Sequence, residues 1–263
     1  MAQATREIKR RIKSVKSTSK ITKAMELISA VKMRKAVDHM LLSRGYAHLA
    51  WQIVVDLAKR TGQTYHKLLQ AREVKKVAVV LVASNRGLCG SFNAQIVASA
   101  YQYALGLFSG DKAPAVDFFL LGKKARDITL KYKQLAAISS LKQIPRIKQL
   151  LPIPQEEDAL LGDVGELTRN TLGVKADLRE YLFEPSPAEV LQKTLPRLIE
   201  TQIYQAVLES DASEHSARML AMKNATEAAH DLIDDLTLAY NQARQAGITQ
   251  EIAEISGTKA AMS

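Results

Sequence analysis

The sequence predicts an α/β protein in which two very long helices, one at each end of the chain, form an antiparallel coiled coil with a small Rossmann-like α/β domain between them. Residues 5–60 contain no proline and a single glycine, and residues 187–256 are again helical in pattern. Between them, two short apolar runs alternate with amphipathic stretches. We therefore expect three segments: an N-terminal coiled-coil helix over 1–65, an α/β domain over 72–184 and a C-terminal coiled-coil helix over 186–260.

The two helical segments are longer than a compact core requires. At about 1.5 Å per residue they would span roughly 80 and 105 Å. A single domain of this size would be only about 35–40 Å across. The helices should therefore protrude, and a protruding helix in water needs a partner along its length. Because the chain reverses direction through its middle, we expect the two helices to pair antiparallel.

Apolar residues of the first helix fall on two stripes at spacings of three and four: Ile8, Ile12 and Val15, then, on a shifted stripe, Ile21, Met25 and Ile28. The shift predicts a helix that twists around its partner. The same helix is strongly basic. Residues 1–35 hold eleven Lys or Arg against Glu7 and Glu26, a balance of +9, while the whole chain carries +10. An acidic surface is the expected neighbour of this helix.

The middle of the chain alternates strand and helix patterns. Val74–Ala83 is β-branched and nearly all apolar, which is typical of a buried parallel strand. A turn rich in Gly, Asn and Ser follows over Ser84–Asn93, then a helical pattern over Phe92–Phe108 that places Ile96, Ala100, Tyr103 and Leu107 on one face. Ala115–Leu121 predicts a second strand, and a second helix follows Gly122. Two further candidate strands are Leu135–Leu141 and Asp177–Phe183.

The last helix has a clear start and a repeating seam. Ser186 can cap it, Pro187 fits its first turn, and Glu189 completes a capping box. Pro196 and Gly247 are the expected interruptions. Apolar residues then recur in heptads: Met222, Ala229, Leu236 and Ala243, with Ala225, Leu232 and Ala239 between them. The apolar tip of Ile248, Ile252 and Ile255 should insert into another surface if the helix protrudes.

Candidate chemical sites are few. Gly87-Leu88-Cys89-Gly90 follows a strand and precedes a helix, where phosphates bind in dinucleotide folds, but it lacks the G-x-G-x-x-G spacing and is not a P-loop. A tight turn between a strand and a helix, which requires glycine for steric reasons, explains this segment equally well. Cys89 is either a reactive thiol or a packed small side chain. The five histidines show no metal-binding spacing, and no catalytic constellation is present, so we predict no catalytic, cofactor or metal site.

The composition of the chain indicates its cellular compartment and narrows the class of protein. The single cysteine excludes an intrachain disulfide and predicts a reducing compartment. The basic N-terminus is not followed by an apolar signal, and the longest apolar run, Val77–Ala83, is too short to span a bilayer. The basic helix leaves two interpretations open from residue chemistry alone: a coiled-coil protein that binds nucleic acid, or a helix enclosed by acidic protein loops. A nucleotide-dependent enzyme with helical arms is a third.

Three segments of the sequence closely resemble the gamma subunit of bacterial-type F-type ATP synthases: Ile21–Ala36 (ITKAMELISAVKMRKA), Ser84–Asn93 (SNRGLCGSFN) and Ala243–Ile255 (ARQAGITQEIAEI). Tyr181–Pro187 (YLFEPSP) and Glu200–Val207 (ETQIYQAV) are similar to the same family. The matches cover both helices and the first part of the α/β domain.

The resemblance implies a central-stalk rotor that contributes no catalytic residue. In this family the paired terminal helices turn inside a hexamer of alternating alpha and beta subunits, and the α/β domain meets the epsilon subunit and the membrane ring of c subunits. Proton flow turns the ring, and the shaft couples ion transport to ATP synthesis on beta. The implied location is the cytoplasmic face of the bacterial plasma membrane, as a peripheral membrane protein that binds no nucleic acid.

The resemblance also implies contact residues by position. Met25 matches the family methionine near a beta-subunit lever loop, and Arg34 and Lys35 match a basic segment of the family. Arg244, Gln245 and Thr249 match positions that hydrogen-bond a beta-subunit catch loop. Ile248, Ile252 and Ile255 would form the hydrophobic bearing tip.

This chain departs from the family pattern in two places. Asn85 stands where the family usually has Asp, and Ser91-Phe92 where it has Gly-Leu. The stretch between Lys133 and Leu151 is also shorter than the family pattern, which predicts an abbreviated α/β domain with altered epsilon and ring contacts.

Overall fold

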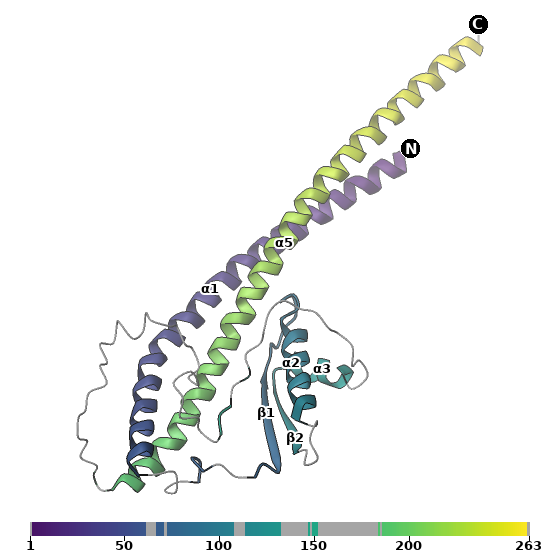
Figure 1. Ribbon diagram of the computed structural model, residues 1–263. Helices are drawn as coiled ribbons and strands as arrows, with labels where there is room; N and C mark the ends of the chain where they lie inside the picture. Colours follow the sequence, from purple (N-terminus) through teal and green to yellow (C-terminus); the bar gives the residue numbers. More distant parts are fainter. Residues whose placement is uncertain are drawn as a thin grey trace. The chain divides into compact units, whose positions relative to one another are not determined.

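The computed structural model describes residues 2–61, 67–70, 73–107, 114–132, 147, 149–151, 184 and 186–261. The chain divides into two compact units: a terminal unit of Met1–Val31 with Ser216–Ser263, and a central unit of Lys32–His215. Helix α1 (Ala2–Thr61) and helix α5 (Pro187–Ala261) contribute to both units. Two long helices, shorter helices and a small parallel sheet make up the described residues (Figure 1), which confirms the predicted fold class.

The long helices begin and end near their predicted positions. Ser186 caps α5, since its Oγ accepts a hydrogen bond from the Glu189 N–H at 3.3 Å. The helix then runs through Pro196 and Gly247, so the predicted interruptions are wrong. Pro196 lies on an exposed face, where water can solvate the carbonyl that loses its helical bond. The segment boundaries 1–65, 72–184 and 186–260 stay predictions, because the connecting residues lie outside those described.

The central unit contains the predicted parallel sheet. Strands β1 (Lys76–Val82) and β2 (Ala115–Leu121) pair in parallel, and helix α2 (Phe92–Leu107) connects them. Helix α3 (Lys123–Tyr132) follows β2. Both strands and both helices match the sequence prediction to within about two residues. The candidate strands over 135–141 and 177–183 lie outside the described residues.

One face of the sheet packs against α2 and α3. Leu81 of β1 is buried with Val97 and Ala100 of α2 and with Ala125 of α3. On the same face, the rings of Tyr101 and Phe118 stack with centroids 5.4 Å apart, and burial raises the pKa of Tyr101 above its ordinary 10.0. The predicted face of α2 was right in part. Ala100 is buried and Ile96 packs against this core, whereas Tyr103 is exposed. The buried stripe holds Val97, Ala100 and Ala104.

A second core of the central unit lies between the two long helices. It joins Ala50, Trp51 and Val54 of α1 to Leu69 and to Leu191, Leu195 and Leu198 of α5. Ser210 of α5 also donates a hydrogen bond of 3.1 Å to the carbonyl of Val82, the last residue of β1. Helix α5 is therefore attached both to α1 and to the sheet within this unit.

Candidate functional site: the paired helices and their exposed surface

In the terminal unit, α1 and α5 meet along a seam of mostly small or polar side chains. The Oγ1 atoms of Thr22 and Thr226 are 2.7 Å apart and hydrogen-bonded. On both sides of this pair, buried or half-buried positions recur at spacings of three and four: Thr5, Ile8, Ile12, Val15, Ser19, Thr22, Glu26 and Ser29 on α1, with Arg218, Met222, Thr226, Ala229, Ile233, Leu236, Tyr240, Ala243 and Gly247 on α5. This is the repeat of a coiled coil.

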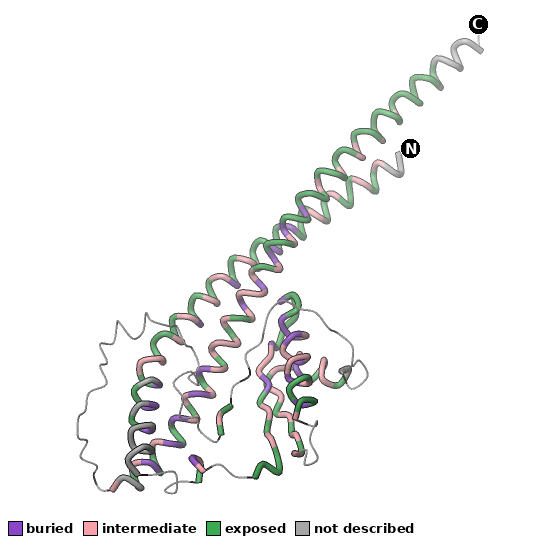
Figure 2. The backbone as a smooth tube through the Cα atoms, in the orientation of Figure 1, coloured by how far each residue is buried: buried purple, intermediate pink, exposed green. Residues whose placement is uncertain are grey.

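The direction of the pairing is antiparallel within the terminal unit. Both chain ends lie at the same end of this unit in Figure 1, and Thr22 faces Thr226. At 1.5 Å per residue on both helices, Ala2 then lies level with about residue 246 of α5. The last turns of α5 continue past the start of α1, and the described positions there are exposed (Figure 2).

The predicted seam was right in part. Ile8, Ile12 and Val15 of α1 and Met222, Ala229, Leu236 and Ala243 of α5 lie in it. The shifted stripe of α1 does not: Ile21 and Ile28 are more than half exposed, as are Leu27 and Val31. Small hydroxyl side chains hold the seam instead, which allows close helix approach and turns the large apolar side chains outward.

The cations of α1 lie on the outside of the helix. Lys9, Arg10, Arg11, Lys13, Lys16, Lys20 and Lys23 are all exposed. Glu7 forms an ion pair with Arg11 at 3.0 Å, and Glu26 forms one with Lys23 at 3.0 Å. Both acids of this stretch are thus already paired within the helix, so the remaining cations give the outer surface a net positive charge.

The predicted contact residues of α1 lie beside this surface. Met25 is half-buried at the edge of the seam, next to the exposed Leu27 and Ile28. Arg34 and Lys35 are exposed on the same helix, in the part that belongs to the central unit. All three side chains are accessible to a neighbouring protein at least in part.

The predicted contact residues of α5 cluster on its final turns. Arg244, Gln245 and Thr249 are exposed, and the Thr249 hydroxyl donates to the Gln245 carbonyl at 3.0 Å within the helix. Ile248, Ile252 and Ile255 are also exposed, rising to 69% at Ile255. The structure therefore brings the predicted polar contacts and the predicted bearing tip together on one stretch of helix.

The turn after β1 is closed by its own side chains. Asn93 accepts a hydrogen bond from the Ser84 N–H at 3.0 Å and donates to Ser84 Oγ at 2.7 Å and to Cys89 Sγ at 3.1 Å. Asn85 accepts a bond from the Lys123 N–H at 3.1 Å, which caps α3. Cys89 is buried, as the packed interpretation of this thiol predicts. These bonds favour a structural turn over a phosphate site.

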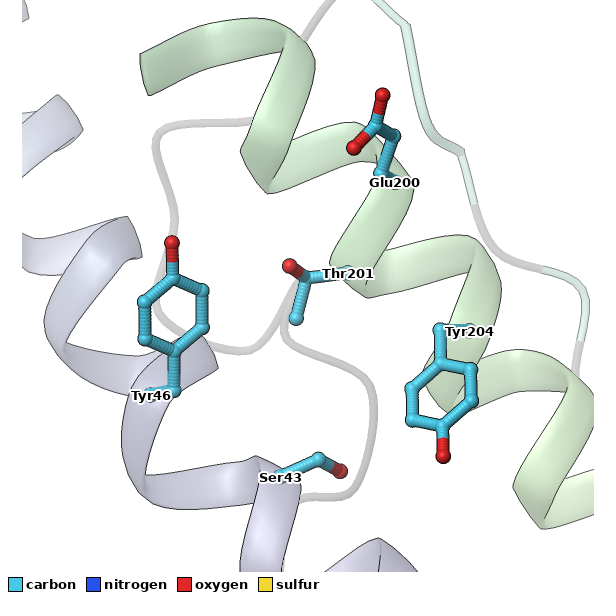
Figure 3. Close-up of a pocket in the computed structure, with 5 residues that line it drawn as sticks. All are labelled: Ser43, Tyr46, Glu200, Thr201 and Tyr204. Atoms are coloured by element: carbon cyan, nitrogen blue, oxygen red, sulfur yellow. The ribbon is translucent and has the colours of Figure 1, made fainter.

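Other chemical sites find little support in the described part of the chain. Those residues contain no group of three or more His, Cys, Asp or Glu placed to hold a metal ion. A shallow, open groove in the central unit is lined by Ser43 and Tyr46 of α1 and by Glu200, Thr201 and Tyr204 of α5 (Figure 3). None of the described helices is both long and apolar enough to cross a membrane.

Comparison with known proteins identifies the family. A family model described as ATP synthase matches residues 4–138 and 132–262. The chain is 41% identical to the ATP synthase gamma chain of Herpetosiphon aurantiacus, over 100% of this chain and 99% of that relative. It is 39% identical to the gamma chain of Coxiella burnetii, with 98% of each covered. The rotor of the Euglena gracilis mitochondrial ATP synthase has the same fold, with 18% identity, a TM-score of 0.52, and coverage of 94% of this chain and 100% of that one.

The fold defines a class of proteins in which a long two-helix coiled coil is combined with a small parallel α/β unit. The sequence comparisons give the family within that class: the chain belongs to the ATP synthase gamma-chain family. They do not support the nucleic-acid alternative.

The comparisons also bear on the abbreviated α/β domain. The two ranges matched by the family model meet at residues 132–138, where the shortened stretch begins. The alignment with the Herpetosiphon aurantiacus relative covers 297 positions, more than the 263 residues of this chain. The relative therefore carries additional residues inside the aligned region, and the position of the shortening between Lys133 and Leu151 stays a prediction.

The outward stripe of Ile21, Leu27, Ile28 and Val31 is the part of the candidate surface that sequence reasoning missed. Two of its members, Ile21 and Ile28, were assigned to the seam because they are large and apolar. A strict heptad count started from Ile8 would have found it, since the count passes through Ser19, Thr22 and Ser29 and leaves the large residues outside.

Proposed function

We propose that this chain is the central-stalk rotor subunit of an F-type ATP synthase, and that it transmits torque between a membrane ring of c subunits and a hexamer of alpha and beta subunits. The observation that carries the proposal is the antiparallel pairing of the two chain ends, fixed at Thr22 and Thr226, in a member of the gamma-chain family. A coil with small seam residues gives a narrow shaft, which suits rotation inside a sleeve of other subunits.

The exposed surface supports a role in coupling. Rotation changes the affinity of surrounding subunits only if the shaft presents different contacts in each orientation. The basic and apolar outer surface of α1, with Met25 at its edge, supplies such an asymmetry toward beta subunits. Arg34, Lys35, Arg244, Gln245 and Thr249 supply further polar contacts to beta.

The final turns of α5 form the second contact region in this proposal. Ile248, Ile252 and Ile255 are exposed where α5 has passed the start of α1. Enclosure by the alpha and beta subunits would remove this apolar surface from water, which is favourable by about 25 cal/mol per Å². The tip would then act as the bearing of the shaft.

The remaining parts of the proposal concern chemistry and location. We assign ATP synthesis to the beta subunits and no catalytic residue to this chain. The α/β part of the central unit would meet the epsilon subunit and the c ring. The complex would place the chain at the cytoplasmic face of the bacterial plasma membrane, peripheral to the bilayer.

Co-purification and rotation test the proposal. A tagged chain expressed in its own host should bring down alpha, beta and epsilon subunits after nuclease treatment. A bead attached to α2 of the central unit, with the hexamer fixed to glass, should turn when ATP is added. Hydrolysis of ATP by the intact complex without bead rotation, or recovery of nucleic acid in place of alpha and beta subunits, would refute it.

A further inference from the structure

The seam between α1 and α5 changes from apolar to polar side chains within the central unit. On α5, the fully buried positions Leu191, Leu195 and Leu198 pack against α1, and the same spacing of four and three continues to Gln202 and Gln205. Both glutamines are 2% exposed. Because they continue the stripe that faces α1, their amides enter the seam rather than the solvent.

The level of α1 that faces these amides is fixed by the groove beside them. Figure 3 shows Ser43 and Tyr46 of α1 opposite Glu200, Thr201 and Tyr204 of α5. Ala47 of α1, one turn from Ser43, is buried, which places a small side chain in this part of the seam.

Three buried polar atoms of these two amides have no hydrogen-bond partner in the protein. They are Gln202 Oε1, Gln205 Oε1 and Gln205 Nε2. Buried polar groups of native proteins are nearly always paired, with protein or with ordered water. Unpaired atoms on two amides that lie one turn apart on the same buried stripe therefore point to a guest bound by them.

The chemistry of these atoms selects the guest. The two amide oxygens accept hydrogen bonds, while the amide nitrogen of Gln205 donates them. An anion would serve only the donors, and a cation only the acceptors. Water donates and accepts, and a buried water usually makes about three such bonds.

We propose that Gln202 and Gln205 form an internal water site of the helix pair. The apolar seam of Leu191, Leu195 and Leu198 ends at these two glutamines. The site binds water through buried amides on the stripe of α5 that faces α1, so the water forms part of the contact between α1 and α5 in the central unit.

Oxygen-17 magnetic relaxation dispersion tests the proposal, because it counts water molecules that stay bound for longer than the tumbling time of the full chain. The double variant Gln202→Leu/Gln205→Leu keeps side-chain volume and removes both amides. Gln102→Leu, an exposed glutamine on α2, is the matched control. We expect the double variant to lose at least one long-lived water and the control to lose none.

An unchanged count in the folded double variant would overturn the proposal. If the double variant does not fold, a crystal structure of the unaltered chain at high resolution gives the second measurement. Ordered water within hydrogen-bond distance of the Gln205 amide supports the site. Direct pairing of the Gln202 and Gln205 amides with protein groups, with no water between them, overturns it.

Discussion

The same two helices pair in two different ways in the two units of this chain. In the central unit, Trp51 and Val54 meet three fully buried leucines. In the terminal unit, the buried positions nearest the contact are Ser19, Thr22 and Ser29 on α1, with Met222, Thr226 and Ala229 on α5. The first pairing resembles the core of a globular domain. The second brings two backbones close together with little apolar surface between them.

This difference shows where each stretch obtains its stability. Burial of a leucine contributes about 1.5–3 kcal/mol, so the central pairing can hold itself together. Around Thr22 the terminal seam buries small hydroxyl side chains, while the large apolar side chains of Leu27 and Ile28 face outward. In the proposed function, surrounding subunits would stabilise a helix pair of this kind by covering its outward apolar residues.

The largest expected effect is on the central pairing. Leu195→Ala would leave a cavity at a position with no exposure and should lower the free energy of unfolding by about 2–5 kcal/mol. Chemical denaturation of the purified chain measures this. Leu220→Ala on the same helix, where the side chain is 52% exposed, is the control and should change stability by about 0.5 kcal/mol or less. Equal losses for the two variants would contradict the comparison.

A smaller effect should follow from enlarging the terminal seam. Ala229→Leu adds volume at a buried position of a close helix contact, and overpacking of this kind costs about 1–3 kcal/mol. The control is His230→Leu, one residue along on an exposed face. Thermal unfolding followed by circular dichroism compares them. A gain in stability for Ala229→Leu would mean that the seam has room for large side chains.

The hydroxyl pair of the terminal seam should contribute about 1 kcal/mol. Thr22→Val or Thr226→Val alone leaves one buried hydroxyl without its cross-helix partner, whereas the double change removes both. The double variant should therefore be less destabilised than the sum of the single variants. A double-mutant cycle with a coupling energy of about 0.5–1.5 kcal/mol is expected. Strict additivity would show that the two hydroxyl groups do not interact.

The smallest expected effect on stability comes with a change in function. Met25→Lys places a cation at the edge of the seam and should alter the folding free energy by about 0.5 kcal/mol or less. In the assembled complex it should lower the number of protons pumped per ATP hydrolysed, because the proposed contact would place the new positive charge against a beta subunit. Met25→Leu, which keeps the apolar side chain, serves as control. Unchanged pumping in membrane vesicles with Met25→Lys would remove this residue from the proposed contact.

The sequence predicted the elements of this fold better than it predicted their faces. Ala115–Leu121 was found without error because a β-branched and aromatic run between polar turns has few alternatives. The seam of α1 was found only over Ile8–Val15. Beyond Val15, hydrophobicity pointed to Ile21 and Ile28, while the structure uses Ser19 and Thr22. One sequence does not show which apolar residues face a partner chain and which face the fold.

The candidate site shows the same limit. The apolar tip was predicted because Ile248, Ile252 and Ile255 recur on a helix too long for a core. The bonds that close the turn after β1 were not foreseen, since they depend on Asn93 reaching back to Ser84 across the first turn of α2. Side-chain hydrogen bonds within loops follow from backbone geometry, which composition does not encode.

The overhang of α5 has a consequence for the free subunit. Its final turns carry the exposed Ile248, Ile252 and Ile255, and short unsupported helices are marginal in water. In dilute solution these turns should exchange their amide protons rapidly and be the first part of the chain that a protease trims. Enclosure by a surrounding assembly would protect them, so the C-terminus of this chain would report whether it has been built into its complex.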